Sequence, residues 1–230
     1  MRKLIVLFLF LSINLFANDF TRAETLYKQE KYALAKPIFE KIIKEDAQNY
    51  KAIEYLGDIA GHAKNWDEAL KYYEKLKNAN PKNANYQYKF GGALGMKAKE
   101  SNKFAALRML DDIEHAFVTA AKLDSKHIDT RWALVEFYLQ IPAIVGGSEK
   151  KAQKYALELM KISAVDGYLS QGHIHEYFKR YEKAEISYKK AFEIGNSKVT
   201  FQKLHNLYTH KLKQPQKATA LKLAFDKIRN

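Results

Sequence analysis

Small and aromatic residues recur in this chain at a spacing close to 34 residues, and this recurrence constrains the fold more than any other feature. Ala35 and Ala69 are 34 residues apart, and each is followed four positions later by an aromatic residue, Phe39 or Tyr73. The same position returns further along as Ile113, Ala152, Ala184 and Ala218. A period of roughly 20 to 50 residues is typical of arrays built from one repeated supersecondary unit. The sequence therefore predicts stacked repeats.

The repeats are expected to be helical. The chain has only 10 Gly and 4 Pro among its 230 residues, and this scarcity favours helices joined by short turns over a fold rich in strands. Small residues allow two helices to approach closely, and the aromatic residue one turn later fills the space towards the next helix. A helix pair cannot bury its apolar face alone, so neighbouring pairs must stack. An irregular helical bundle is the alternative.

The clearest motif lies in the second repeat. Leu56-Gly57 belongs to one apolar helical pattern, and Trp66-x-x-Ala69-x-x-x-Tyr73 belongs to the next, which Pro81 ends. This arrangement resembles the tetratricopeptide repeat (TPR), a helix–turn–helix unit of about 34 residues. The resemblance implies an all-α fold, a right-handed TPR solenoid of about six helix–turn–helix units that forms one domain over residues 18–230.

The third and fourth repeats are expected to be irregular. The spacing from Ala69 to Ile113 is 44 residues and that from Ile113 to Ala152 is 39, so both repeats carry extra residues. In the third repeat, two lengthened helices are expected to meet near Ser101, with Ser101 as the N-cap of the second helix. A long third repeat together with the stretch P-x-I-V-G-G-S is similar to a group of exported bacterial TPR proteins without an assigned activity.

The stretch Ile141 to Ser148 in the fourth repeat has some features of a phosphate-binding loop. A β-branched run leads into Gly146-Gly147-Ser148, and lysines follow. The spacing does not match a Walker loop, and no other strand pattern exists to support one. The repeat phase instead predicts a connection between two helices, with Ser148 as an N-cap. A helix start preceded by glycine can still hold an anion, so Gly147, Ser148 and Lys150 form a candidate anion site.

The first 17 residues are predicted to be a secretory signal peptide. Arg2 and Lys3 precede an apolar run over residues 4–16, and Ala17 stands at a cleavage position. An uncleaved membrane anchor is the alternative, although the run is short for one. The protein is therefore expected to be exported, to the periplasm or the medium, without a membrane span after cleavage. The absence of Cys excludes disulfides, thiolate metal sites and a Cys nucleophile.

No motif points to catalysis, a metal or a cofactor. His173 and His175 are two residues apart and so point to different faces of a helix, and "HIHEYF" is not a zinc-protease motif. The paired acids Asp111 and Asp112 lie in a charged helical stretch, where solvation is the usual explanation. The net charge of +13 comes from lysines spread along the chain, which favours a solvated surface over a nucleic-acid track.

The remaining candidates lie on the first helix of each repeat, because these helices line the groove where TPR solenoids bind peptides. Residues at groove-facing spacing are Glu54, Asp58 and His62 in the second repeat, Tyr88 and Met96 in the third, and Trp132, Glu136 and Gln140 in the fourth. Packing between repeats is the alternative role for each. Glu54 and Asp58 are acidic where TPR domains that grip C-terminal carboxylates carry a basic clamp, which disfavours a receptor of that kind.

These observations predict an exported interaction module or scaffold that binds a peptide or protein in its concave groove and catalyses no reaction. The alternative is a protein that binds anions or a cell-envelope polymer, through its lysine-rich surface or the helix start at Gly146-Gly147-Ser148.

Overall fold

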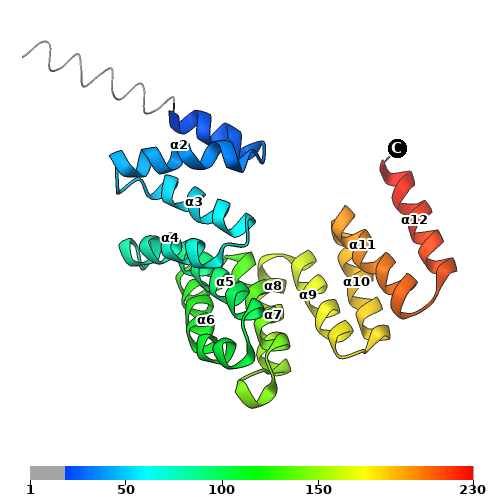
Figure 1. The fold of residues 1–230 in the computed structure, drawn as a ribbon. Coiled ribbons are helices and arrows are strands. Elements are labelled where there is room, and N and C mark those ends of the chain that lie inside the picture. The colour runs from blue at the N-terminus through cyan, green and yellow to red at the C-terminus, as the bar shows by residue number, and fades with distance from the viewer. Residues whose placement is uncertain (1–18, 230) are drawn as a thin grey trace, which may run out of the picture. The chain divides into compact units, whose positions relative to one another are not determined.

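The computed structural model describes residues 19–229, which are helical and contain no strand (Figure 1). A helix over residues 19–28 comes first. It is followed by α2 (Tyr32–Glu45), α3 (Tyr50–His62), α4 (Trp66–Ala79), α5 (Ala84–Glu100), α6 (Lys103–Leu123), α7 (Ile128–Gln140), the 3-10 turn η1 (Ala143–Val145), α8 (Glu149–Ile162), α9 (Ala164–Tyr177), α10 (Tyr181–Gly195), α11 (Lys198–Asn206), the π turn η2 (Leu207–Lys211) and α12 (Pro215–Arg229). No helix in this range is long and apolar enough to cross a membrane. The predicted signal peptide, residues 1–17, lies outside the described residues.

The helices pair in chain order as the repeat phase predicts. The recurring small or apolar residue lies in the second helix of each pair, from Ala35 in α2 to Ala218 in α12. The chain divides within α6 into two compact parts, an N-terminal half that ends at Ala116 and a C-terminal half that begins at Phe117. The single domain over residues 18–230 stays a prediction.

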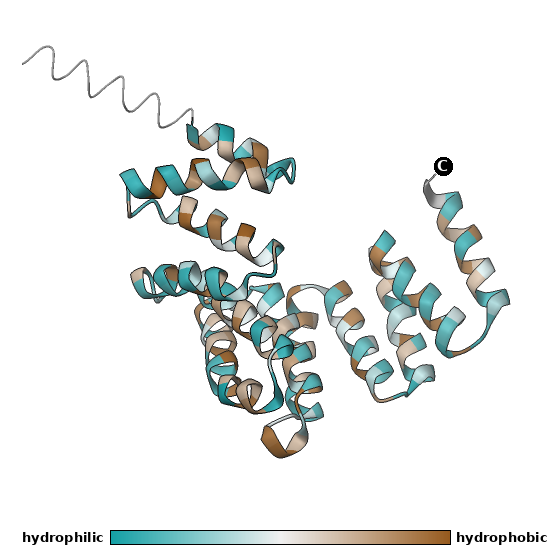
Figure 2. Cartoon of the chain, viewed as in Figure 1, coloured by the Kyte–Doolittle hydropathy of each residue, from teal (hydrophilic) through white to brown (hydrophobic). Residues whose placement is uncertain are grey.

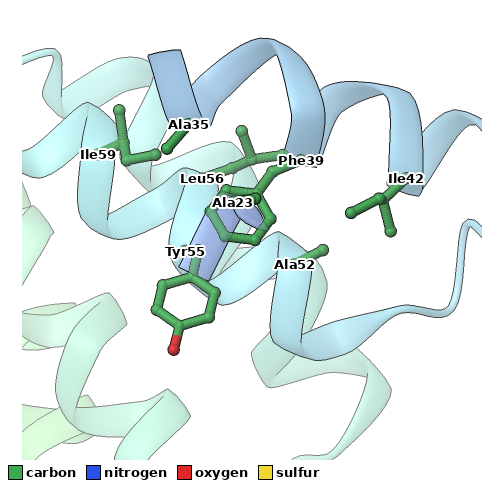
Figure 3. Packing of buried hydrophobic residues seen from close by; sticks show 8 residues of the cluster. All are labelled: Ala23, Ala35, Phe39, Ile42, Ala52, Tyr55, Leu56 and Ile59. Atoms are coloured by element: carbon green, nitrogen blue, oxygen red, sulfur yellow. The ribbon is translucent and has the colours of Figure 1, made fainter. Parts of the chain in front are cut away.

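The core of the N-terminal half forms where the helix over residues 19–28, α2 and α3 meet (Figure 3). The rings of Phe39 and Tyr55 stack with their centroids 4.8 Å apart. Ala23 and Ala35 have no exposed surface, and their small side chains let the helices approach. A second cluster joins α3, α4 and α5 around Ile53, Ala69 and Leu76. Each helix pair thus shares its apolar surface with the next pair, as a repeat array requires.

The C-terminal half has its own core between α9, α10, α11 and α12. Tyr188, Leu204 and Leu207 are almost completely buried there. The last helix is held by ring stacking, since Phe201 of α11 and Phe225 of α12 lie 4.4 Å apart between centroids. These contacts bury the apolar face of α12, the last helix of the described chain.

Two glycines in first helices receive the ring of a tyrosine from the second helix of the same repeat. A Cβ added to Gly57 would lie 2.5 Å from the ring of Tyr73, and one added to Gly172 would overlap the ring of Tyr188. Each tyrosine hydroxyl then donates to a carboxylate on the first helix, Tyr73 to Asp58 at 2.6 Å and Tyr188 to Glu176 at 2.9 Å. The glycine is therefore required by a close approach that closes the hairpin.

Side-chain caps set the helix starts, and one of them differs from the prediction. Asn49, Asn65 and Asn83 cap α3, α4 and α5 by accepting a backbone N–H three residues further on. Ser101, predicted as the N-cap of α6, does not have that role. Its hydroxyl donates to the Lys97 carbonyl at 2.8 Å and so satisfies the end of α5, while the side chain of Asn102 accepts the Ala105 N–H at 3.0 Å.

The stretch from Ile141 to Ser148 is a connection between two helices, as the repeat phase predicts. Gly146 has a φ of +105°, a left-handed conformation that favours glycine. A Cβ on Gly147 would collide with the Ile141 carbonyl oxygen. Ser148 caps α8 by accepting the Lys151 N–H at 3.2 Å. The two glycines therefore serve the chain reversal.

We expect the substitution Gly57→Ala to destabilise the protein and Gly92→Ala to stabilise it. The methyl group at residue 57 must displace the Tyr73 ring, and overpacking of this kind costs about 2 kcal/mol. A Cβ at Gly92 meets nothing within 4 Å, so alanine there gains about 0.5–1 kcal/mol of helix propensity. Urea unfolding of both variants measures the difference. Equal effects would contradict the assigned packing of Gly57.

Candidate functional site

The predicted groove residues of α3 occupy one helical stripe, but they differ in exposure. Glu54 is only 8% exposed, Asp58 is half-buried, and His62 is exposed at the end of the helix. His62 stacks on Tyr32 with ring centroids 4.5 Å apart, and its Nε2 lies 3.2 Å from the Tyr32 hydroxyl. The stripe therefore contains two partly buried carboxylates and one aromatic pair.

Lys89 of α5 pairs with both carboxylates of α3, and Lys51 adds a second cation at Glu54. Its Nζ lies 3.0 Å from Glu54 Oε1 and 2.5 Å from Asp58 Oδ1. Asn85 adds a hydrogen bond of 2.9 Å to Glu54, and Tyr73 donates to Asp58. These contacts join the first helices of the second and third repeats. Sequence reasoning missed Lys89, although its position 31 residues after Asp58 is close to one repeat and could have indicated the pair.

The ionisation of these groups follows from their surroundings. Burial raises the pKa of the Glu54 carboxyl, but the charges and hydrogen bonds of Lys89 and Lys51 outweigh burial, so this pKa lies below its usual value. Burial, together with the Asp58 charge, raises the pKa of Tyr27 to about 12. The surface around α3 is therefore a charge-balanced network at neutral pH.

The groove candidates of α5 lie around an open position. Tyr88, Gly92 and Met96 are four residues apart and share one side of the helix. Tyr88 is half-buried, whereas 39% of Met96 is exposed. Because an added Cβ at Gly92 would contact nothing within 4 Å, the helix backbone is accessible between an aromatic ring and a thioether. We refer to Tyr88, Gly92 and Met96 as the α5 notch.

The groove candidates of α7 are linked to α9 by two polar contacts. The indole N–H of Trp132 donates to Asp166 at 2.9 Å, and Glu136 lies 2.6 Å from His173 Nε2. Gln140, which is exposed, donates to Glu136 at 2.8 Å. The hydrogen bonds to the Glu136 carboxylate, above all the contact with His173, hold its pKa below the usual value despite burial.

Part of the α7 set also serves packing. Trp132 is half-buried against the core of the C-terminal half, so truncating it would affect folding as well as any binding. Asp166 and His173 were absent from the predicted set, although Asp166 lies 34 residues after Trp132, one full repeat, and that spacing could have indicated the pair. A binding role for the eight groove residues stays a prediction. Among the described residues, no group of three or more His, Asp or Glu side chains is arranged to hold a metal ion.

The candidate anion site has few donors left. The Gly147 N–H donates to the Pro142 carbonyl at 3.1 Å, and the Ser148 N–H donates to the Tyr138 carbonyl at 2.9 Å. Glu149 already places a carboxylate on the first turn of α8, where it pairs with Arg180. Lys150 is exposed. The prediction of an anion site therefore rests on Lys150 and the start of the helix.

Comparison with known families agrees with the repeat phase. Tetratricopeptide repeat models match residues 26–89 and residues 165–195. The first match ends within α5 and the second begins in α9, so most of the irregular third and fourth repeats lies between them. The chain is a TPR protein, and the predicted all-α solenoid of helix–turn–helix repeats is confirmed. No curated protein matches the sequence.

Several solved structures share this fold at low sequence identity. A thermophilic TPR protein from Thermus thermophilus is 16% identical with a TM-score of 0.66, and the match covers 86% of this chain and 97% of the other. PilW, a widely conserved type IV pilus biogenesis factor, is 14% identical with a TM-score of 0.68, and the match covers 93% of both chains. PilF from Pseudomonas aeruginosa is 13% identical with a TM-score of 0.64, over 93% of this chain and 91% of PilF. At these identities the likeness shows the fold alone.

We expect the substitution Lys89→Met to destabilise the N-terminal half by about 2 kcal/mol at pH 7, because it removes the cation that the two partly buried carboxylates share and leaves only Lys51 beside Glu54. The folded-state pKa of Glu54 is lowered by Lys89, so this stabilisation is present above the normal carboxylate pKa and is lost as the pH falls through the folded pKa. The deficit of the variant should therefore shrink towards pH 4. Urea unfolding at both pH values measures it.

Lys97→Met is the matched control. Lys97 pairs with Asp67, whose side chain is 73% exposed, so this substitution should change stability little. A deficit of Lys89→Met that equals the control, or that grows in acid, would contradict the network.

Proposed function

We propose that this TPR protein is an exported scaffold that binds a peptide or protein partner on the first helices of its repeats and catalyses no reaction. TPR repeats are interaction modules, and stacked first helices offer a surface along which a peptide can lie. Export is proposed from the organisation of residues 1–17. Its test is the start of the protein isolated from cells, expected at Asn18, whereas a start at Met1 would contradict cleavage.

The α5 notch is the observation that carries the binding proposal. Gly92 leaves the helix surface open between Tyr88 and Met96, so a partner side chain can reach the backbone of α5. Tyrosine supplies a rigid contact surface at low entropic cost, and methionine adapts to differing shapes. The partner is expected to place an apolar side chain in the notch, because both neighbours are largely apolar and the nearby carboxylates are already paired with Lys89.

The test is photo-crosslinking in intact cells. A photoreactive amino acid replaces Met96 in the α5 notch, and the control carries it at Lys75, an exposed residue of the second helix α4. We expect a reproducible protein adduct from residue 96 and none from residue 75. Adding Gly92→Trp, which fills the notch, should reduce the adduct about tenfold, equivalent to about 1.4 kcal/mol.

Gly92→Ala is the control for Gly92→Trp. It also replaces the glycine but adds only a methyl group, so it shows whether the loss of adduct comes from filling the notch. It should leave most of the adduct. Adducts of equal yield from residues 75 and 96, or an adduct that persists with Gly92→Trp, would contradict binding at the α5 notch.

A further inference from the structure

The connection between α7 and α8 presents apolar side chains to solvent. Ile144 is 94% exposed, and Pro142 and Ala143 are exposed as well. Figure 2 shows this connection as a brown turn at the lower end of α7. Connections are usually polar because they run over the surface. Burial ordinarily stabilises an isoleucine, but the one at the tip of this turn is almost fully exposed. The turn is therefore suited to contact an apolar environment outside the protein.

The turn is held in one shape by its own backbone. The Val145 and Gly147 N–H groups both donate to the Pro142 carbonyl, at 3.0 and 3.1 Å, and the Ser148 N–H donates to Tyr138. Gly147 cannot be replaced without a collision with the Ile141 carbonyl. Because these amides are satisfied internally, moving the turn out of water exposes few unpaired polar groups, and unpaired groups are the main cost of placing backbone in an apolar medium.

A second exposed apolar group lies at the same end of the C-terminal half. The turn from α9 to α10 carries Tyr177 and Phe178, which are 48% and 40% exposed. Arg180 in this turn pairs with Glu149, the first residue of α8. This ion pair ties the α9–α10 turn to the helix start that directly follows the exposed isoleucine.

Exposed lysines surround both turns. Lys150 and Lys154 lie on the first turns of α8, and Lys179 and Lys183 lie in or just after the α9–α10 turn. The acidic residues here are fewer than the cations. Glu149 pairs with Arg180, Glu158 pairs with Arg131 and Lys154, Glu176 accepts a hydrogen bond from Tyr188, and Glu182 is exposed. The local charge is therefore positive. We refer to the α7–α8 turn, the α9–α10 turn and their four lysines as the basic apolar edge.

We propose that the basic apolar edge docks on the surface of an anionic lipid bilayer, with Ile144 inserted among the acyl chains near the headgroups. An anionic bilayer has negatively charged headgroups over an apolar interior. Exposed apolar side chains with lysines beside them complement both layers. A protruding side chain on a convex turn inserts into a fluid surface without a preformed pocket, whereas a protein partner would have to supply one. This proposal is independent of the groove and of export.

Vesicle flotation tests the proposal. The chain starting at Asn18 is used, because it keeps every described residue and omits the apolar segment over residues 4–16, which would bind lipid by itself. It is mixed with vesicles of phosphatidylcholine containing phosphatidylglycerol, whose negative surface attracts lysines, or with vesicles of phosphatidylcholine alone. We expect binding to the anionic vesicles only, and loss of most of it in high salt.

Two matched substitutions locate the contact. Ile144→Asp should reduce binding at least about tenfold, because it replaces the inserted side chain with a charge. Ile194→Asp is the control, since Ile194 is 53% exposed and lies at the opposite end of α10, about 20 Å from the α9–α10 turn by helix rise. It should bind like the unmodified chain. Circular dichroism checks that both variants are folded.

A failure to bind anionic vesicles would overturn the proposal, and so would equal losses from the two substitutions. If vesicles do not bind while a photoreactive residue at position 144 yields a protein adduct in cells, the edge is a protein-docking surface and the lipid proposal is wrong. Since the α5 notch is tested at different residues, its outcome does not affect this one.

Discussion

The contact between a tyrosine ring and a helical glycine is the interaction on which each half of this protein depends. Gly57 receives Tyr73 in the N-terminal half, and Gly172 receives Tyr188 in the C-terminal half. Without a side chain at the glycine, the two helices of a repeat come close enough for the ring to fill the space between them. The same ring then fixes a carboxylate through its hydroxyl. One pair of residue types thus closes the hairpin and orients a polar group on the first helix.

Polar contacts at nearly one repeat spacing join successive hairpins. Lys36 reaches Glu68 between second helices, 32 residues apart, and Lys89 reaches Asp58 between first helices, 31 residues apart. Because these pairs are partly buried, removing one partner costs more than it does in an exposed ion pair. The Lys89 contacts also reduce the negative charge of the carboxylates on the first helix α3. The α5 notch, between Tyr88 and Met96, is an apolar part of the first-helix surface.

The sequence predicted the repeat phase well because helix pairing is encoded at fixed spacing. The small residue at the position of Ala69 and the aromatic residue at the position of Tyr73 mark the second helix of a repeat, and their recurrence predicts the TPR fold. The prediction that Ser101 caps α6 was wrong. Ser101 and Asn102 are adjacent polar residues that can both cap a helix, and the hydroxyl of Ser101 is used at the end of α5 instead. Lys89 and His173 were missed, although each follows its acidic partner, Asp58 or Glu136, by close to one repeat. The exposure of Ile144 could not be predicted from the sequence either, because the β-branched residues around it do not indicate which side chains of the turn face solvent.

The first helices are proposed to be where this protein recognises its partner. The most direct measurement selects peptides from a random displayed library and maps the best binder by hydrogen exchange. We expect that a consensus containing an apolar residue emerges and that bound peptide slows exchange in α3, α5 or α7 more than in α4 or α8. Selection that yields no consensus, or protection confined to the second helices, would contradict it.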